Sequence, residues 1–147
     1  MKFRLFLLAL VMCFVATAST QEQVKRPEVI WKPVFGYKNP HSKAYVDINS
    51  LDEDGEFVSG ALLISFNDSA TTMIKGKPLV LKSVVKHIVV NCEKHYLVPV
   101  MDFYFDVEKP TRADKPLAGA EYPANIEGAL ALDKTSPIYK TFCPVYI

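Results

Sequence analysis

The hydrophobic residues of this chain concentrate in two long stretches near its middle. Residues 79–90 are rich in Val, Ile and Leu, and residues 95–105 are rich in Val, Tyr and Phe. Such residues favour strands, and the polar residues 91–94 between them suit a turn, so the pattern predicts a long β-hairpin. Because side chains alternate between faces, we expect one parity in each arm to line a common buried surface. These residues are Val84, Ile88, Val90 and Cys92 in the first arm, and Leu97, Met101, Phe103 and Phe105 in the second.

The other segments are shorter and less regular. Residues 57–66 predict a further strand, and the polar residues 67–78, with Gly76 and Pro78 as breakers, predict a loop. The remaining expectations are an edge strand or irregular extended segment at 29–37, a short strand at 44–48, a turn at 52–55 and a loop at 108–123.

A short helix is predicted close to the C-terminus. Thr135 or Ser136 can cap it, Pro137 suits its first position, and Pro144 ends it. Its apolar side would combine Ile138, Tyr139, Phe142 and Cys143. A helix of this length is not stable alone in water, so we expect it to dock on the sheet.

The N-terminus has the features of an export signal. Lys2 and Arg4 precede an apolar run over residues 5–16, and Ala16 and Ala18 provide the small residues that a signal peptidase requires. We therefore predict a signal peptide at 1–18, a flexible leader at 19–28 and a single domain at 29–147. Cys13 is an unsuitable lipid-attachment site, because Met12 stands where a small residue is needed.

Charge excludes one class of partner. Removal of residues 1–18 leaves 15 basic residues against 16 acidic ones, so the formal charge falls from +1 to about −1. A nearly neutral chain with scattered basic residues is not typical of a nucleic-acid-binding protein. No second apolar run of membrane length follows the signal, so no transmembrane segment is expected in the mature chain.

Cys92 and Cys143 are the two cysteines of the predicted mature chain, and we expect them to pair. Closing a loop of about fifty residues would stabilise the fold by about 4 kcal/mol on the chain-entropy model. Two free thiols or an intermolecular bridge are the alternatives. The predicted fold class is α+β, mainly β: an antiparallel sheet with a short C-terminal helix tethered by a disulfide.

The order of these landmarks resembles the surface-adhesin protein E family of Gram-negative bacteria. The matching features are Trp31, Tyr45-Val46-Asp47, Ser50, Asp54-Gly55, Ser83-Val84, Cys92 and Cys143. The resemblance implies an antiparallel sheet with a disulfide-tethered helix. The chain departs from the family in lacking a lipid-attachment cysteine, in having Asn91 where an acidic residue is common, and in lacking a tryptophan at 122–132.

The resemblance also implies a binding role. The family's adhesin uses a basic stretch of its central strands to bind host matrix proteins such as vitronectin and laminin. By position, Lys86 and Lys94 are the partner-binding candidates in this chain, although lysines on a sheet also serve simply to keep its edges soluble. The family adhesin forms dimers through its sheets, and the mixed face with Val85 and Val89 suits a homodimer.

Candidate catalytic and metal-binding patterns are weak. The chain has no nucleophile elbow and no C-x-x-C motif, so we expect no enzyme activity. His41, His87 and His95 are candidate metal or haem ligands, haem being a reported ligand of the family's founding member. A two-residue turn would place His87 and His95 on opposite faces of the hairpin, whereas a longer turn allows one face. The acidic residues 52–56 fit a solvated turn better than a calcium loop. We therefore predict no metal and no cofactor.

Three functions fit these observations. The first is an exported binding module of the adhesin type, on the cell surface or in the periplasm, that contacts a host matrix protein or an envelope component. The second is a periplasmic structural or stress-related accessory protein. The third is a carrier for haem or another apolar ligand, which requires a cavity.

Overall fold

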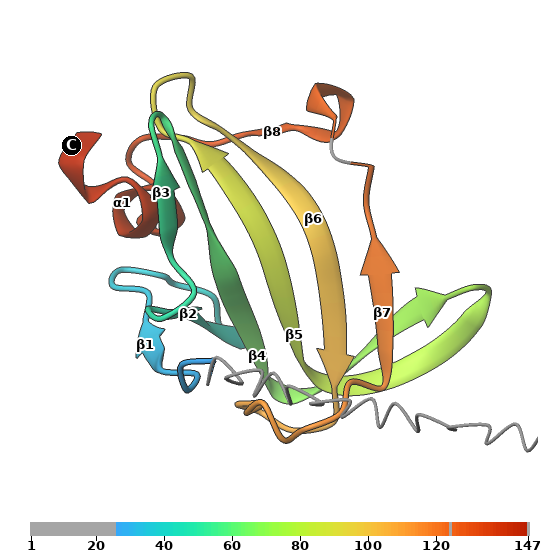
Figure 1. The fold of residues 1–147 in the computed structure, drawn as a ribbon. Coiled ribbons are helices and arrows are strands. Elements are labelled where there is room, and N and C mark those ends of the chain that lie inside the picture. Colours follow the sequence, from blue (N-terminus) through green and yellow to red (C-terminus); the bar gives the residue numbers. More distant parts are fainter. Residues whose placement is uncertain (1–25, 124, 147) are drawn as a thin grey trace, which may run out of the picture.

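The computed structural model describes residues 26–123 and 125–146, and its centre is one antiparallel sheet (Figure 1). Six strands form the path β1-β2-β4-β5-β6-β7, while β3 pairs with β4 and β8 pairs with β6. The strands are β1 (Trp31–Pro33), β2 (Ser42–Asp47), β3 (Asp52–Asp54), β4 (Phe57–Ile74), β5 (Lys77–Asn91), β6 (Tyr96–Phe105), β7 (Ala118–Glu121) and β8 (Leu130–Ala131). The predicted hairpin is confirmed as β5 and β6, with its turn at 92–95.

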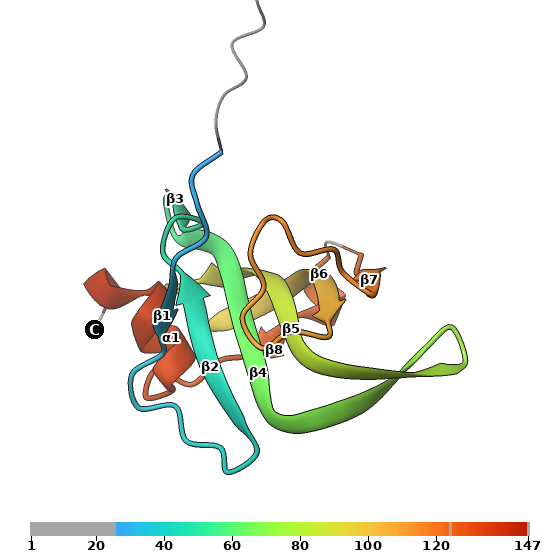
Figure 2. The same cartoon turned by 90° about the horizontal axis from the view of Figure 1, so that it is seen from below.

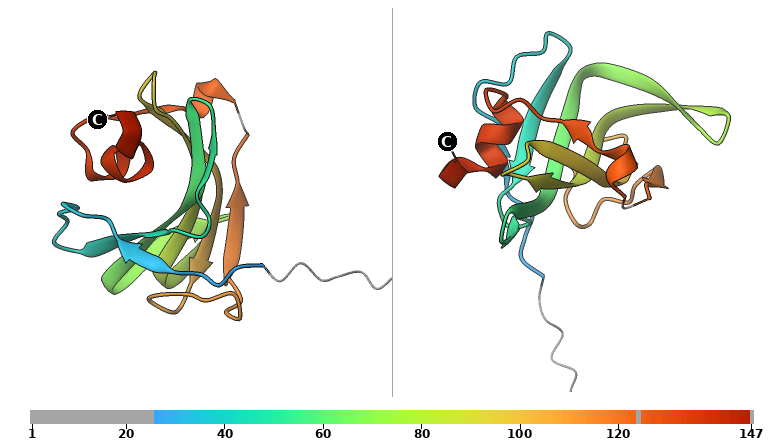
Figure 3. Two further views of the ribbon diagram at one scale, coloured as in Figure 1. Left: turned by 60° about the vertical axis from the view of Figure 1, so that its left-hand side comes forward. Right: turned by 90° about the horizontal axis from the view of Figure 1, so that it is seen from above.

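A short helix, α1 (Pro137–Phe142), follows the sheet, with 3₁₀ turns at η1 (Ile126–Gly128) and η2 (Pro144–Tyr146). Ser136 is its N-cap, accepting a hydrogen bond from the Tyr139 N–H at 3.1 Å, and Pro137 occupies the first helical position. The helix lies on the side toward which the sheet curves (Figure 3). The predicted fold class is therefore confirmed: a mainly antiparallel sheet with a short C-terminal helix tethered by a disulfide.

The sheet is covered on both faces. On the helix-side face, Val58, Leu62 and Val90 pack against Tyr139 and Phe142 of α1. On the opposite face, which we call the loop-side face, a second cluster contains Tyr45, Ala61, Leu63, Val85 and Phe105. Leu62 and Leu63 are adjacent in β4 and 3% and 0% exposed, so alternation along this strand separates two buried faces.

Close approach of α1 depends on one glycine of β4. A Cβ atom at Gly60 would lie 2.8 Å from Leu51 Cδ2 and 3.1 Å from Phe142 Cε1. Both distances are shorter than ordinary van der Waals contact, so the absence of a side chain lets the helix lie directly on the sheet.

The predicted loop at 67–78 is wrong. β4 and β5 continue through this region as a two-stranded arm, which closes at a two-residue turn between Ile74 and Lys77 and projects from the sheet (Figure 2). Lys75 and Gly76 both have positive φ, 50° and 77°, as the common two-residue hairpin turn requires. Gly76 and Pro78 therefore close a hairpin instead of breaking the strands. Ala70, Ile74 and Leu79 pack against a cluster around Leu81, Val84 and Tyr104, but most other side chains of the arm are exposed, so its hydrophobic pattern is weak.

The predicted common surface of the hairpin is also wrong in part. Val90 pairs with Leu97 as expected, but a register shift between His87 and Ile88 changes the parity of the rest of β6. Phe103 consequently pairs with Val85, on the loop-side face. A single extra residue in one strand moves every following side chain to the other face, and the hydrophobic pattern alone does not locate it.

Three short strands were missed or misassigned. β3 occupies residues 52–54 of the predicted turn at 52–55. The observed turn is therefore shorter and includes Gly55, which has a positive φ of 59°. β7 lies within the predicted loop at 108–123, and β8 was not predicted. Gly and Ala make up most of β7, so pairing with β6 and not local propensity fixes it. The predicted signal peptide, and the leader as far as residue 25, lie outside the described residues. Among the helices described, none is long and apolar enough to span a membrane.

Candidate functional site

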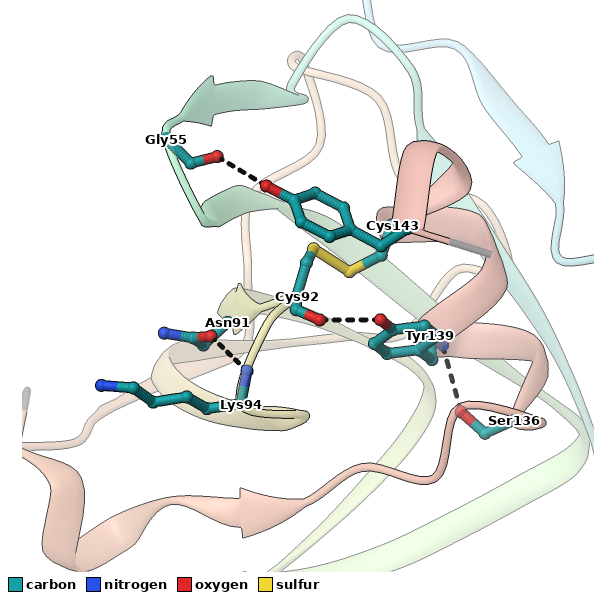
Figure 4. Close-up of a disulfide and its surroundings, with 8 residues drawn as sticks. Gly55, Asn91, Cys92, Lys94, Ser136, Tyr139 and Cys143 are labelled. Carbon is teal, nitrogen blue, oxygen red and sulfur yellow. Dashed lines mark hydrogen bonds between the residues drawn. A yellow bond between two sulfur atoms is a disulfide. The ribbon is translucent and has the colours of Figure 1, made fainter.

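The turn between β5 and β6 lies beside the C-terminal helix and is covalently linked to it (Figure 4). The disulfide joins Cys92, at the start of the turn, to Cys143, with the two Cα atoms 5.6 Å apart. The predicted pairing is therefore confirmed, and free thiols and an intermolecular bridge are excluded in this structure. Both cysteines are 1% exposed, so the bridge belongs to the helix-side core.

Hydrogen bonds reinforce this link. The Tyr139 hydroxyl donates to the Cys92 carbonyl oxygen at 2.7 Å, entirely within the core. The Cys92 N–H donates to the Glu56 carbonyl oxygen at 2.8 Å, and the Tyr146 hydroxyl donates to the Gly55 carbonyl oxygen at 3.3 Å. The helix, the β5–β6 turn and the β3–β4 turn are thus held together at one end of the sheet.

Lys94 occupies the tip of this turn, and its side chain is exposed. Its backbone N–H donates to Asn91 Oδ1 at 2.8 Å, and Asn91 itself is fully buried. His95 then takes a positive φ of 54°, which reverses the chain into β6. A neutral amide at position 91 accepts this bond without burying a charge, so the departure from the family's acidic residue has a structural role here.

Lys86 is in a different environment. Its Nζ lies 2.6 Å from Asp102 Oδ2 in the neighbouring strand, and the two side chains are 37% and 2% exposed. The Tyr122 hydroxyl also donates to Asp102 Oδ2, at 2.9 Å. Burial, followed by the bond to Asp102, raises the pKa of Tyr122 well above its usual value, so the phenol remains a proton donor. The charge of Lys86 is therefore directed toward the sheet.

His87 and His95 do not form a common site. His87 packs edge-on against Phe103 on the loop-side face, with ring centroids 5.7 Å apart. His95 packs edge-on against Tyr139, at 5.5 Å, on the helix side. The two histidines thus lie on opposite faces although the turn has four residues. Burial lowers the pKa of His87, while Asp102 and Asp47 act in the opposite direction. Within residues 26–123 and 125–146, no three His, Cys, Asp or Glu side chains are grouped to hold a metal ion.

Two buried acids escaped the sequence-based prediction. Asp102 lies in β6 and Asp47 at the end of β2, 2% and 3% exposed. Asp102 is the single acid of the mainly apolar β6, and Asp47 directly follows the apolar residues 44–46 of β2; these are the available signals in the sequence. One oxygen of Asp102, Oδ1, is buried without a hydrogen-bond partner in the described part of the chain.

Comparison with known proteins gives one family. The family model described as "Surface-adhesin protein E" matches residues 31–112, from β1 into the β6–β7 loop. A solved structure of Haemophilus influenzae protein E is 17% identical, with 70% of this chain and 78% of that chain covered and a TM-score of 0.46. A crystal structure of protein E from non-typeable Haemophilus influenzae is 14% identical, with 79% and 81% covered and a TM-score of 0.43. No curated protein matches the sequence.

Proposed function

We propose, from the premise that this chain belongs to the surface-adhesin protein E family, that it is an exported, non-enzymatic module that binds another protein. The family supports an adhesin-like role and an extracytoplasmic location. The buried Cys92–Cys143 disulfide supports an oxidising compartment, because such bonds persist outside the cytosol. A host matrix protein or an envelope component is the proposed partner.

The observation that carries this proposal is the turn at 92–95, which is anchored by the buried Cys92 and exposes Glu93 and Lys94 at its tip. The disulfide and the buried Asn91 fix the turn, so a partner that contacts Lys94 would not need to order it first. Of the two predicted lysines, Lys94 is the direct contact in this proposal. Lys86 contributes less, because Asp102 neutralises its ammonium group.

The β4–β5 arm is a second exposed surface, suited to a homodimer. Val85 is 7% exposed and covered on the loop-side face, so it is not available for the dimer face predicted from the sequence. Met73 and Val80, at 62% and 60% exposed, are exposed large apolar side chains of the arm. We propose that any dimer forms through the arm, and gel filtration of wild type beside Met73→Ser and Val80→Ser tests this. A monomer at high concentration would contradict it.

Protease treatment of intact cells tests location. We expect the protein to be lost from washed cells, while a periplasmic marker survives. Full protection, with recovery in the periplasmic extract, would instead support the accessory-protein function and remove the adhesin assignment.

Binding to immobilised vitronectin and laminin tests the role of Lys94. We expect Lys94→Glu to slow association several-fold at low salt, with a smaller effect at high salt, because an exposed charge acts mainly on the encounter rate. Lys115→Glu is the matched control, since it makes the same charge change on an exposed residue of the β6–β7 loop. Equal effects of the two substitutions would show that net charge, and not the turn, governs binding.

A further inference from the structure

A cavity of about 290 Å³ lies on the loop-side face, away from the turn and the disulfide. Its floor is formed by side chains of β4, β5 and β6, namely Ala61, Val85, His87, Phe103 and Phe105. Its walls come from two segments that are distant in sequence, the N-terminal segment with Trp31 and the β6–β7 loop with Pro110 and Arg112. The proposed adhesin function makes no use of this cavity.

Hydrogen bonds hold the two walls together. The Trp31 indole Nε1–H donates to the Pro110 carbonyl oxygen at 2.8 Å, and Arg112 Nε donates to the Pro27 carbonyl oxygen at 2.6 Å. Within the loop, the Thr111 N–H and hydroxyl both donate to Asp114 Oδ2, at 2.7 and 2.8 Å. The cavity is therefore formed in advance of any ligand, which lowers the entropic cost of binding.

Asp47 provides a buried negative charge at the cavity wall. Its side chain is 3% exposed, and Oδ1 accepts the Ile30 and Asn49 N–H groups at 2.9 and 3.1 Å. Among the described residues, no donor reaches the second oxygen, Oδ2, and no cationic side chain forms an ion pair with this carboxylate. In the described part of the chain the buried oxygen without a partner is Asp102 Oδ1, so Asp47 Oδ2 keeps some solvent access and can accept from a ligand. The negative charge of Asp47 would attract a cation that enters the cavity.

The other groups of the cavity also favour a cation. Trp31, Phe103 and Phe105 are aromatic, and ammonium groups are attracted to aromatic faces. The same loop-side cluster already holds one such contact, with Lys109 Nζ 4.2 Å from the centroid of the Tyr45 ring. The remaining ionisable residues of the lining are Arg112 and Asp114 on the loop, whose charges offset each other, and His87, whose lowered pKa favours the neutral ring. Asp47 therefore sets the sign of the charge. An anionic ligand would be repelled by it.

We propose that this cavity is a binding site for a small organic ammonium ion with an apolar or aromatic body. The body fills the space between Trp31, Phe103 and Phe105, and the ammonium group donates to Asp47 Oδ2. The volume suits one aromatic ring with a short side chain.

Trp31 provides a direct assay, because it is the single tryptophan of the chain and lines the cavity. Its fluorescence is followed on titration with benzylamine, benzyl alcohol and phenylacetate, which share a ring and differ in charge. We expect benzylamine to bind at least tenfold more tightly than the other two. Equal affinities, a preference for phenylacetate, or no saturable signal with benzylamine would each overturn the proposal.

Substitution of Asp47 tests the assigned group. Asp47→Asn keeps an oxygen that can accept from Ile30 and Asn49 but removes the charge, so we expect benzylamine affinity to fall about tenfold while benzyl alcohol binding is unchanged. Asp54→Asn, on exposed β3, makes the same charge change outside the cavity and should leave both affinities as in wild type. If Asp47→Asn does not fold, two other measurements still test the site. One is the wild-type ligand series, and the other is Phe103→Leu, which should weaken benzylamine binding several-fold. Unchanged benzylamine affinity in folded Asp47→Asn would refute the site.

Discussion

The two faces of the sheet are built from the same strands but are covered in different ways. On the helix-side face, α1 is tied by a disulfide and by the Tyr139 hydroxyl, and its Tyr139 and Phe142 side chains are each 1% exposed. On the loop-side face, the N-terminal segment and the β6–β7 loop meet through hydrogen bonds such as that of Trp31 to Pro110. The first covering buries these rings and leaves a pocket of about 150 Å³ beside Phe142 and Cys143, whereas the second leaves a cavity of about 290 Å³.

This difference separates stability from recognition. A covalently tied helix with buried aromatic side chains supplies free energy of folding but has little room for a ligand. A loop held by polar contacts contributes less, and it can surround unfilled space beside a buried carboxylate. We therefore expect substitutions on the helix side to lower stability most, and those on the loop side to change binding more than stability.

Replacing one phenylalanine on each face by alanine tests this difference in stability most directly. Phe142→Ala should lower the free energy of unfolding by about 3–5 kcal/mol, since it removes a ring that is 1% exposed and leaves a cavity in its place. Phe103→Ala, beside an existing cavity and only partly buried, should cost roughly 1–2 kcal/mol. Urea denaturation of both variants gives the comparison. Similar losses would show that the two faces contribute equally.

Removing the disulfide should lower stability nearly as much as Phe142→Ala. Cys143→Ser is expected to cost about 2–5 kcal/mol and lower Tm by several degrees, because the unfolded chain loses its cross-link. The Cys92→Ser/Cys143→Ser double variant serves as the control and should be no less stable than the single one. An unchanged melting curve of Cys143→Ser under oxidising conditions would count against the bridge.

The hydrogen bond between Trp31 and Pro110 on the loop-side face should contribute less to stability than the disulfide. Trp31→Phe keeps an aromatic ring but removes the hydrogen bond to Pro110, at an expected cost of about 1 kcal/mol. Hydrogen exchange should rise in the β6–β7 loop, residues 106–117, and stay unchanged in α1. Faster exchange in α1 would mean that the two coverings are coupled.

The smallest expected effect is the contribution of His87 to the pH dependence of stability. Partial desolvation of the His87 ring lowers its pKa against the opposing effects of Asp102 and Asp47, so the folded protein favours neutral imidazole. As pH falls below the ordinary histidine pKa of about 6.5, the unfolded chain binds the proton more readily, and stability should fall toward the lower folded pKa. His87→Asn should show a shallower loss of stability between pH 7.5 and 5, measured by urea denaturation. His41→Asn makes the same change outside the cavity lining and is the control. Identical slopes for all three proteins would contradict the assignment.

The sequence was informative where local chemistry is specific. Ser136, Pro137 and Pro144 bound the helix, and the Val- and Tyr-rich stretches became β5 and β6. It was misleading where structure depends on pairing alone. The β4–β5 arm contains few buried residues, so its polar composition predicts a loop, and the register shift near His87 leaves no mark in the pattern. The ion pair of Lys86 with Asp102 joins residues sixteen positions apart and follows from the register of β5 and β6.

By itself the sequence determined that the chain forms a mainly antiparallel sheet and that a short helix follows it, and it predicted the pairing of Cys92 and Cys143 that the structure confirms. These features depend on propensity, capping and cysteine count, which are local or countable properties. Only the tertiary structure decided that Lys94 is exposed while Lys86 is neutralised, that the two histidines lie on opposite faces, and that Asp47 borders a cavity. Those outcomes depend on which strands pair and in what register, because a shift of one residue exchanges the two faces of a strand.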